Sequence, residues 1–172
     1  MRELCPWYAI TVKHQHEQAV HSALVFKGFE ALAPTYRGRR YWSDRVKELD
    51  LPLFGGYVFC RFPYLERAKV LDTPGVGRIV NFGGNPAEIP NEEIAAIQAV
   101  VASRLPVRPW PYLKPGDRVR VERGPLRGLE GTLLRERDSL RLVIGVEMLQ
   151  RSMSVELEAG MVAPVRALRA AV

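Results

Sequence analysis

A cluster of arginines beside two aromatic residues is the feature of this sequence that most directly suggests chemistry. From Tyr36 to Lys47, the single acid Asp44 stands among five basic side chains: Arg37, Arg39, Arg40, Arg45 and Lys47. Guanidinium groups bind phosphate oxygens, and the affinity of such contacts falls as salt is added. The adjacent rings of Tyr41 and Trp42 could stack on an unpaired base. Two other interpretations stay open: the arginines form a solvated strand face, and Trp42 packs in a core.

The residues that usually carry catalysis or bind metals occur in unsuitable settings. Three histidines, His14, His16 and His21, crowd one segment, and only Glu17 adds a potential ligand, which is too few for a metal site. No serine, cysteine or threonine has a recognisable nucleophile setting, and the glycines at 83–84 lack the lysine and helix of a phosphate-binding loop. We expect no metal, no cofactor and no enzymatic activity.

The composition is that of a folded protein whose charge favours polyanions. The 172 residues are 47% hydrophobic and 26% charged, and the formal net charge is +6. No apolar run approaches the roughly 20 residues that span a bilayer, and the first residues lack the apolar core of a secretory signal. Cys5 and Cys60 do not suggest a disulfide framework. We therefore expect a cytoplasmic protein.

Hydrophobic periodicity predicts an α+β domain in the first part of the chain. Strands are expected at residues 7–12, 29–36, 56–62 and 78–82, and helices at 15–27, 65–71 and from residue 90 onward. The basic segment 37–40 would be a hairpin tip. The first helix has an apolar stripe of Ala19, Val20, Ala23, Leu24 and Phe26, and Gly28 is placed to end it. The last helix would bury Ile94, Ile97, Val100 and Val101. This order fits an antiparallel sheet with flanking helices.

A proline-rich segment separates this domain from a second one. Residues 105–115 contain four prolines, which exclude a regular helix and favour a stiff, extended connector. We expect a first domain at 1–104, a linker at 105–114, a small all-β domain at 115–165 and a tail at 166–172. Short strands in the second domain, at 118–122, 132–137, 140–146 and 152–158, are of the size used in a small barrel.

The start of the second domain carries the clearest motif. Residues 116–133 read GDRVRVERGPLRGLEGTL, in which valines alternate with arginines and glycines mark the turns. This run resembles the KOW motif, found in the C-terminal SH3-like barrel of NusG-type transcription factors and in some ribosomal proteins. The resemblance implies a KOW β-barrel here. A refolding of residues 133–141 into a helical hairpin, known in one specialised paralogue, is the less favoured alternative.

Three blocks of the first domain resemble the NusG N-terminal (NGN) domain: Trp7-Tyr8, LFGGYVF at 53–59 and PGVGRIVNFGG at 74–84. LAP at 32–34 and PAEIP at 86–90 are closer to the specialised antitermination paralogues, of which RfaH is one. The resemblance implies a bacterial transcription elongation or antitermination factor. Its N-terminal domain would bind the clamp helices of the largest RNA polymerase subunit. The residues at matching positions are Trp7, Tyr8, Phe54, Tyr57 and Phe59, with Thr73 facing the opposite pincer.

Strand periodicity adds an inference about this surface. Alternation along residues 56–62 puts Tyr57 and Phe59 on one face, and Val58 and Cys60 on the other. If helices cover the small-residue face, the aromatic face is exposed to a partner and can supply interface hot spots. The alternative is that all of these rings are core residues. Gly55 stands where the family usually has a proline, which leaves the entry to this strand less defined.

The resemblance implies two further surfaces. The segment with Arg37, Arg39, Arg40, Arg45 and Trp42 matches the region through which the specialised paralogues approach upstream DNA or the non-template strand. Leu126, Met148, Leu149 and Arg151 match the barrel edge that binds ribosomal protein S10 or the termination factor Rho. We expect a monomer. The alternative function is a KOW-containing RNA-binding protein that acts on ribosomes or structured RNA.

Overall fold

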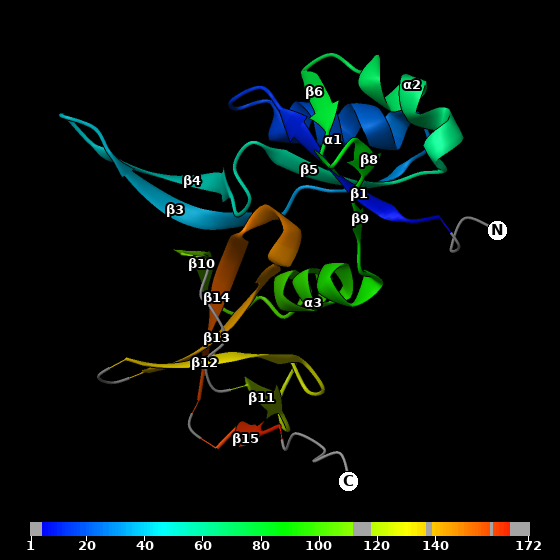
Figure 1. The fold of residues 1–172 in the computed structure, drawn as a ribbon. Helices are drawn as coiled ribbons and strands as arrows, with labels where there is room; N and C mark the ends of the chain where they lie inside the picture. Colours follow the sequence, from blue (N-terminus) through cyan, green and yellow to red (C-terminus); the bar gives the residue numbers. More distant parts are fainter. Residues whose placement is uncertain (1–4, 112–117, 137–138, 159, 166–172) are drawn as a thin grey trace, which may run out of the picture. The chain divides into compact units, whose positions relative to one another are not determined.

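The computed structural model describes residues 5–111, 118–136, 139–158 and 160–165, and it divides into two compact units (Figure 1). The units are Met1–Ala95 and Ala96–Val172. The division falls inside helix α3 (Asn91–Ala102), whereas the sequence placed it after residue 104. The predicted tail at 166–172 lies outside the described residues. In the described part of the chain, no helix combines the length and apolar character needed to cross a bilayer.

The first unit is built on a five-stranded antiparallel sheet. Its central strand β1 (Trp7–Val12) pairs with β5 (Tyr57–Arg61), β6 (Val76–Ile79) and β9 (Glu88–Ile89), while β2 (Glu30–Leu32) pairs with β5. Aromatic and β-branched residues along β1 and β5 suit a pleated, buried surface. The strands predicted at 7–12 and 56–62 are confirmed. The segment 78–82 is instead shared between β6 and a small hairpin of β7 (Asn81–Phe82) and β8 (Asn85–Pro86).

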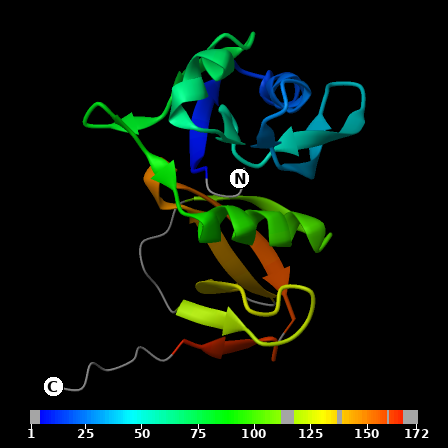
Figure 2. The same ribbon diagram turned by 90° about the vertical axis from the view of Figure 1, so that its right-hand side faces the viewer.

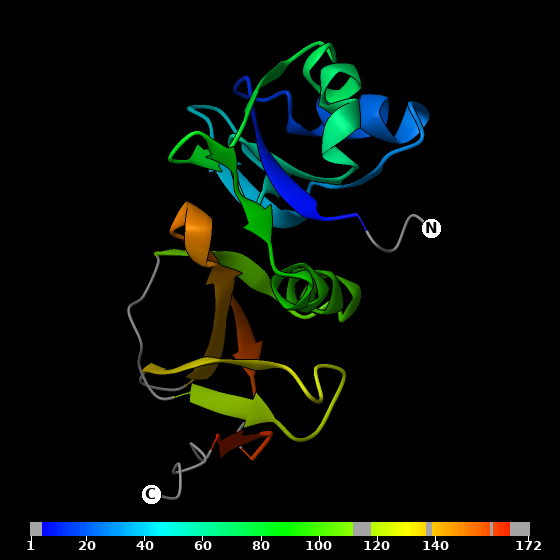
Figure 3. The ribbon, with the colours of Figure 1, turned by 45° about the vertical axis from the view of Figure 1, so that its right-hand side comes forward.

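Helices α1 (Glu17–Phe26) and α2 (Arg67–Leu71) lie side by side, with a 3-10 turn, η2 (Tyr64–Glu66), before α2 (Figure 3). Val20 and Leu24 form the buried stripe of α1, and Gly28, with φ of +86°, ends it. Phe26 was predicted to belong to this stripe, but it is 93% exposed. Two residues along a helix bring a side chain to nearly the opposite side, so Phe26 cannot face the sheet together with Leu24.

One core cluster lies between these helices and one face of the sheet. It contains Tyr8 and Ile10 from β1, Val58 and Cys60 from β5, Val20 and Leu24 from α1, and Val70 from α2. The sheet contributes every second residue of each strand, as its pleat requires. The helices therefore cover the small-residue face of β5.

A second sheet of the first unit is a long two-stranded ribbon that extends away from the rest of the unit (Figure 1). It consists of β3 (Thr35–Tyr41) and β4 (Val46–Pro52). The basic segment 37–40 was predicted to be its tip, but these residues lie within β3. The ladder continues to Tyr41 and Val46, and the Trp42 N–H donates to the Arg45 carbonyl at 2.8 Å to close the turn.

The second unit holds a six-stranded antiparallel sheet in the order β10-β14-β13-β12-β11-β15. Figure 2 shows β11 between β12 and β15. The four strands predicted here are present with shifted ends, and two more join them. The strands are β10 (Val107–Pro111), β11 (Arg118–Val121), β12 (Glu130–Glu136), β13 (Ser139–Val146), β14 (Arg151–Leu157) and β15 (Val162–Pro164).

Strand β10 comes from the segment predicted to be a linker. It is extended, as the prolines require, but it pairs with β14 from Val107 opposite Val155 to Pro111 opposite Arg151. Prolines are tolerated there because β10 is an edge strand, with no neighbour on its other side among the strands that the structure describes. In the preceding helix α3, Ile94, Ile97 and Val100 are buried as predicted, while Val101 is 38% exposed.

Candidate functional site

The register of the first sheet shows which residues share its second face. Ala9 lies opposite Phe59, and Thr11 lies opposite Tyr57. Residues opposite each other in an antiparallel pair point to the same side of the sheet. Tyr57 and Phe59 therefore share a face, away from α1 and α2, while Val58 and Cys60 pack with those helices. The alternation predicted for residues 56–62 is confirmed.

Most aromatic side chains of this second face are buried, however. Phe59 is 0% exposed, and Trp7 and Phe54 are each 1% exposed. The rings of Phe54 and Phe59 meet edge to face, with centroids 5.2 Å apart. The expectation that these rings point outward to a partner is wrong for this structure, because they bury large apolar areas against their neighbours. Tyr57 is half-buried, so part of its side chain remains accessible.

Trp7 belongs to a buried contact that the sequence did not reveal. The Arg61 guanidinium lies over the Trp7 ring, 5.0 Å from its centroid. It also donates to Glu30 Oε2 at 3.1 Å and to Asn91 Oδ1 at 3.2 Å. Arg61 thus links β1, β2 and β5 to the start of α3. Only tertiary contacts identify it, since a lone arginine at a strand end has no sequence signature.

Tyr8 and Thr73 lie on the helix side of the sheet. Tyr8 belongs to the core cluster beneath α1 and α2, and its ring centroid is 4.9 Å from that of Phe62. Burial, and secondarily the Glu88 carboxylate, raises the pKa of the Tyr8 hydroxyl. Thr73 is 2% exposed; its hydroxyl accepts from Lys27 Nζ at 2.9 Å and donates to the Lys69 carbonyl at 3.3 Å. Both residues were predicted to contact RNA polymerase, and in this structure neither has an exposed side chain to offer for such a contact.

The entry to β5 is fixed by a carboxylate that the sequence suggested only as a potential metal ligand. Glu17 is 5% exposed, and its Oε1 accepts from the Gly56 N–H at 2.9 Å. Gly56 has φ of +83°, in the left-handed region that favours glycine. The Tyr57 N–H donates to the Phe54 carbonyl at 3.1 Å and completes the turn. Gly55 is compatible with this ordered geometry.

The basic ribbon has two different faces. On one face Arg37 lies opposite Asp50 and Arg39 lies opposite Glu48. Both pairs form ion pairs of 3.4 Å between Nε and a carboxylate oxygen, with side chains that are more than half exposed. Two of the four predicted phosphate-binding arginines are therefore each already paired with a carboxylate of the ribbon.

The other face brings cations together. Arg40 lies directly opposite Lys47, and both are exposed. At the adjoining turn, the Arg45 guanidinium carbon is 5.6 Å from the centroid of the Trp42 ring. Trp42 is 54% exposed and Tyr41 is 77% exposed, so the core interpretation of Trp42 is wrong. Like charges directly opposite each other destabilise a sheet. An anion placed between the two charges would relieve this repulsion.

The predicted partner-binding residues of the second unit differ in exposure. Leu126 was predicted to contact a partner protein, but its side chain is only 2% exposed and packs in the core, so it offers no exposed contact. Met148 and Leu149 are half-buried in the 3-10 turn η3 (Glu147–Leu149), and Arg151 is exposed at the start of β14.

Comparison with known proteins identifies the family. Residues 6–98 match the family model of NusG, described as transcription termination factor nusG. The chain belongs to the NusG family. Among solved structures, one that describes the domain interaction in Thermotoga maritima NusG aligns with 96% of this chain and with 100% of the Thermotoga chain. The identity is 21% and the TM-score is 0.53.

Two conformations of an MjSpt4:Spt5 complex cover 92% and 94% of this chain, and 97% of the matched chain is aligned in each. The sequence identity is 16%, and the TM-scores are 0.32 and 0.33.

This NusG-family chain is accordingly a transcription factor. Its first unit has the NusG N-terminal fold. Among the described residues, no group of three or more His, Cys, Asp or Glu side chains could hold a metal ion. The candidate feature that sequence reasoning missed is the cross-strand pairing of Arg40 with Lys47. In the sequence, the one indication of this pairing was the alternation of charges with a period of two along residues 37–40 and 47–50.

Proposed function

We propose that this NusG-family factor binds RNA polymerase during transcription, as an elongation or antitermination factor of the specialised, RfaH-like kind. Its first unit binds the clamp helices of the largest polymerase subunit, its ribbon binds upstream or non-template DNA, and its second unit recruits a further partner. Membership of the NusG family is the observation that carries this proposal. The LAP and PAEIP segments support the specialised kind.

Tyr57 is the proposed anchor of the polymerase contact. It lies on the sheet face away from α1 and α2, beside the pair of Phe54 and Phe59, and its side chain is partly accessible. A phenol on such a rigid support loses little conformational entropy on binding and can act as a hot spot. Trp7, Phe54 and Phe59 are buried, and they would contribute indirectly by holding in place the strand that carries Tyr57.

The test compares Tyr57→Ala with Tyr64→Ala, a matched control in which the lost ring is 40% exposed at another site. Removing a hot spot costs about 2 kcal/mol, which weakens binding to purified core polymerase about 30-fold. The control should bind as the parent does, and both variants should keep their affinity for single-stranded DNA. Equal polymerase affinity of Tyr57→Ala and the parent would contradict the assignment of this face.

The ribbon is the proposed DNA contact, through its Arg40 and Lys47 face and not through Arg37 and Arg39. Arg40 and Lys47 lie directly opposite each other, and like charges in such a position destabilise a β-sheet. A phosphate between the two cations would relieve this repulsion, and Trp42 beside Arg45 offers a ring on which an unpaired base can stack.

The second unit is the proposed KOW barrel, which binds ribosomal protein S10 or Rho through its η3 and β14 edge. The alternating buried Val119 and Val121 of β11 support a barrel wall. Met148, Leu149 and Arg151 lie within four consecutive residues of the chain, in and after η3. Replacing Leu149 with aspartate should abolish capture of purified S10 or Rho while polymerase binding persists. Capture of both partners at parental affinity would remove this edge from the proposal.

A further inference from the structure

The second unit carries a basic surface that the proposed partner contacts do not use. Strand β11 alternates Arg118 and Arg120 with Val119 and Val121. The valines are 4% and 1% exposed, so they point into the unit. The side chains of Arg118 and Arg120 are 62% and 59% exposed and therefore share the outer face of the strand.

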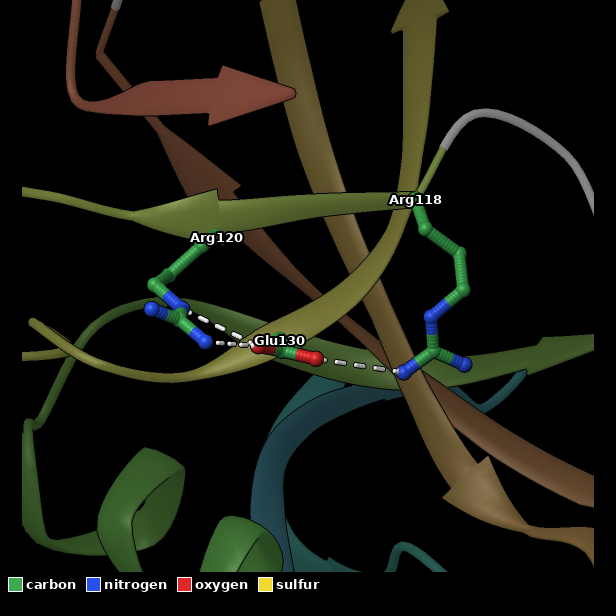
Figure 4. A network of polar contacts seen from close by, with 3 residues as sticks. All are labelled: Arg118, Arg120 and Glu130. Carbon is green, nitrogen blue, oxygen red and sulfur yellow. Dashed lines mark hydrogen bonds and ion pairs between the residues drawn. The ribbon is translucent and has the colours of Figure 1, made fainter. Parts of the chain in front are cut away.

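A single carboxylate holds both guanidinium groups in place (Figure 4). Glu130 on β12 lies opposite Arg120 in the ladder. Its Oε1 accepts from Arg120 Nε at 3.0 Å and also from Arg120 Nη2, while its Oε2 lies 3.7 Å from Arg118 Nη2. Two guanidinium groups present more N–H donors than one carboxylate can accept. The group keeps a net positive charge and donors that remain available to a further anion.

The turn between these strands adds two more arginines on an ordered backbone. Arg123 and Arg127 are exposed. The turn is fixed by the buried Leu126, by the Gly128 N–H donating to the Val121 carbonyl at 2.8 Å, and by the Leu129 N–H donating to the Leu126 carbonyl at 3.0 Å. Residues 118–130 contain four arginines and two glutamates, so this segment has a net charge of 4 − 2 = +2.

We propose that this surface, formed by Arg118, Arg120, Arg123 and Arg127, binds the phosphodiester backbone of a nucleic acid, and that Glu130 weakens the binding. Guanidinium groups recognise phosphate oxygens in pairs, and two that are held side by side lose less freedom on binding than two mobile ones. Glu130 supplies this pre-organisation, but its carboxylate competes with phosphate for the same donors. The surface is therefore suited to transient, salt-sensitive contact with a strand of any sequence.

The experiment uses the full chain carrying Arg40→Gln and Lys47→Gln, so that binding through the β3–β4 ribbon does not obscure the result. Fluorescence anisotropy is measured with a single-stranded oligouridylate, a duplex DNA and polyglutamate over a range of salt concentrations. Three changes are compared in this background: Glu130→Gln, the pair Arg118→Gln and Arg120→Gln, and the pair Arg118→Lys and Arg120→Lys. Arg78→Gln, at an exposed arginine of β6, is the matched control.

Glu130→Gln should bind oligouridylate about two- to fivefold more tightly, the range for one exposed charge interaction. The glutamine pair should flatten the slope of log affinity against log salt by about 1.4, or 0.7 for each lost phosphate contact. The lysine pair should retain the slope, and Arg78→Gln should match the parent. Whether duplex DNA or oligouridylate binds more tightly identifies the source of the phosphates.

Three results would overturn the proposal. These are an unchanged or weaker affinity of Glu130→Gln, an unchanged slope for the glutamine pair, or binding to polyglutamate as tight as to nucleic acid. All of the changed side chains are at least partly exposed, and thermal unfolding of each variant establishes that it is folded. Because the ribbon is neutralised in every variant, failure here leaves the proposed DNA contact of the ribbon untouched.

Discussion

Neutralising one face of the β3–β4 ribbon should weaken DNA binding, while removing the same charge from the other face should not. The first variant carries Arg40→Gln and Lys47→Gln, and the second carries Arg37→Gln and Arg39→Gln. Each lowers the formal net charge by the same amount, from +6 to 6 − 2 = +4. Long-range attraction to DNA therefore falls equally in both, and only local contacts differ.

The expected magnitude follows from the ion pairs. Arg37 and Arg39 lie 3.4 Å from Asp50 and Glu48, so their charges are already matched within the ribbon. Arg40 and Lys47 face each other, and each can take one phosphate. Losing two contacts to a single strand flattens the salt slope by about 1.4, so over a fourfold rise in salt the variant should lose about sevenfold less affinity than the parent.

The assay is fluorescence anisotropy with a labelled single-stranded DNA at several salt concentrations. The second variant should retain the parental slope and remain folded, because exposed ion pairs contribute only about 0–1 kcal/mol each. Equal loss of slope in both variants would refute the distinction between the two faces. An unchanged slope in both would remove the ribbon from the DNA interface.

Three further outcomes test the structure itself. Glu17→Ala should lower the free energy of unfolding by about 1–3 kcal/mol in urea titrations, because it leaves the N–H of Gly56 without its acceptor; Glu17→Gln, which keeps an acceptor, should cost less. Burial raises the pKa of the Cys60 thiol to about 12, so iodoacetamide at neutral pH should alkylate half-buried Cys5 and spare Cys60, as read by peptide mass spectrometry. Hydrogen bonding to arginine holds the pKa of Glu130 below its ordinary value of 4.5, so its stabilisation is complete above that value and disappears as the pH falls through the lower folded-state pKa. Parent and Glu130→Gln should therefore converge in stability at acid pH, and a gap that persists there would contradict this linkage.

Local pattern was sufficient for much of the fold. The alternation in β1, β5 and β11 and the apolar positions of α1 and α3 are short-range properties, so the strands and helices could be predicted with small errors at their ends. The predicted division of β5 into an aromatic face and a small-residue face was confirmed for the same reason. The basic ribbon was also identified, although its tip was placed too early, because no turn signal distinguishes residues 38–40 from 42–45.

Exposure and pairing were decided only by the tertiary structure. The pattern places Phe54 and Phe59 near each other but cannot say whether anything covers them, since covering depends on residues distant in sequence; both prove buried. Register determines that Arg39 meets Glu48 while Arg40 meets Lys47, and a shift of one residue would exchange their faces. The sequence by itself therefore determined the elements and the charges they carry. Long-range pairing decided which of these charges lie beside a carboxylate of the chain and which do not.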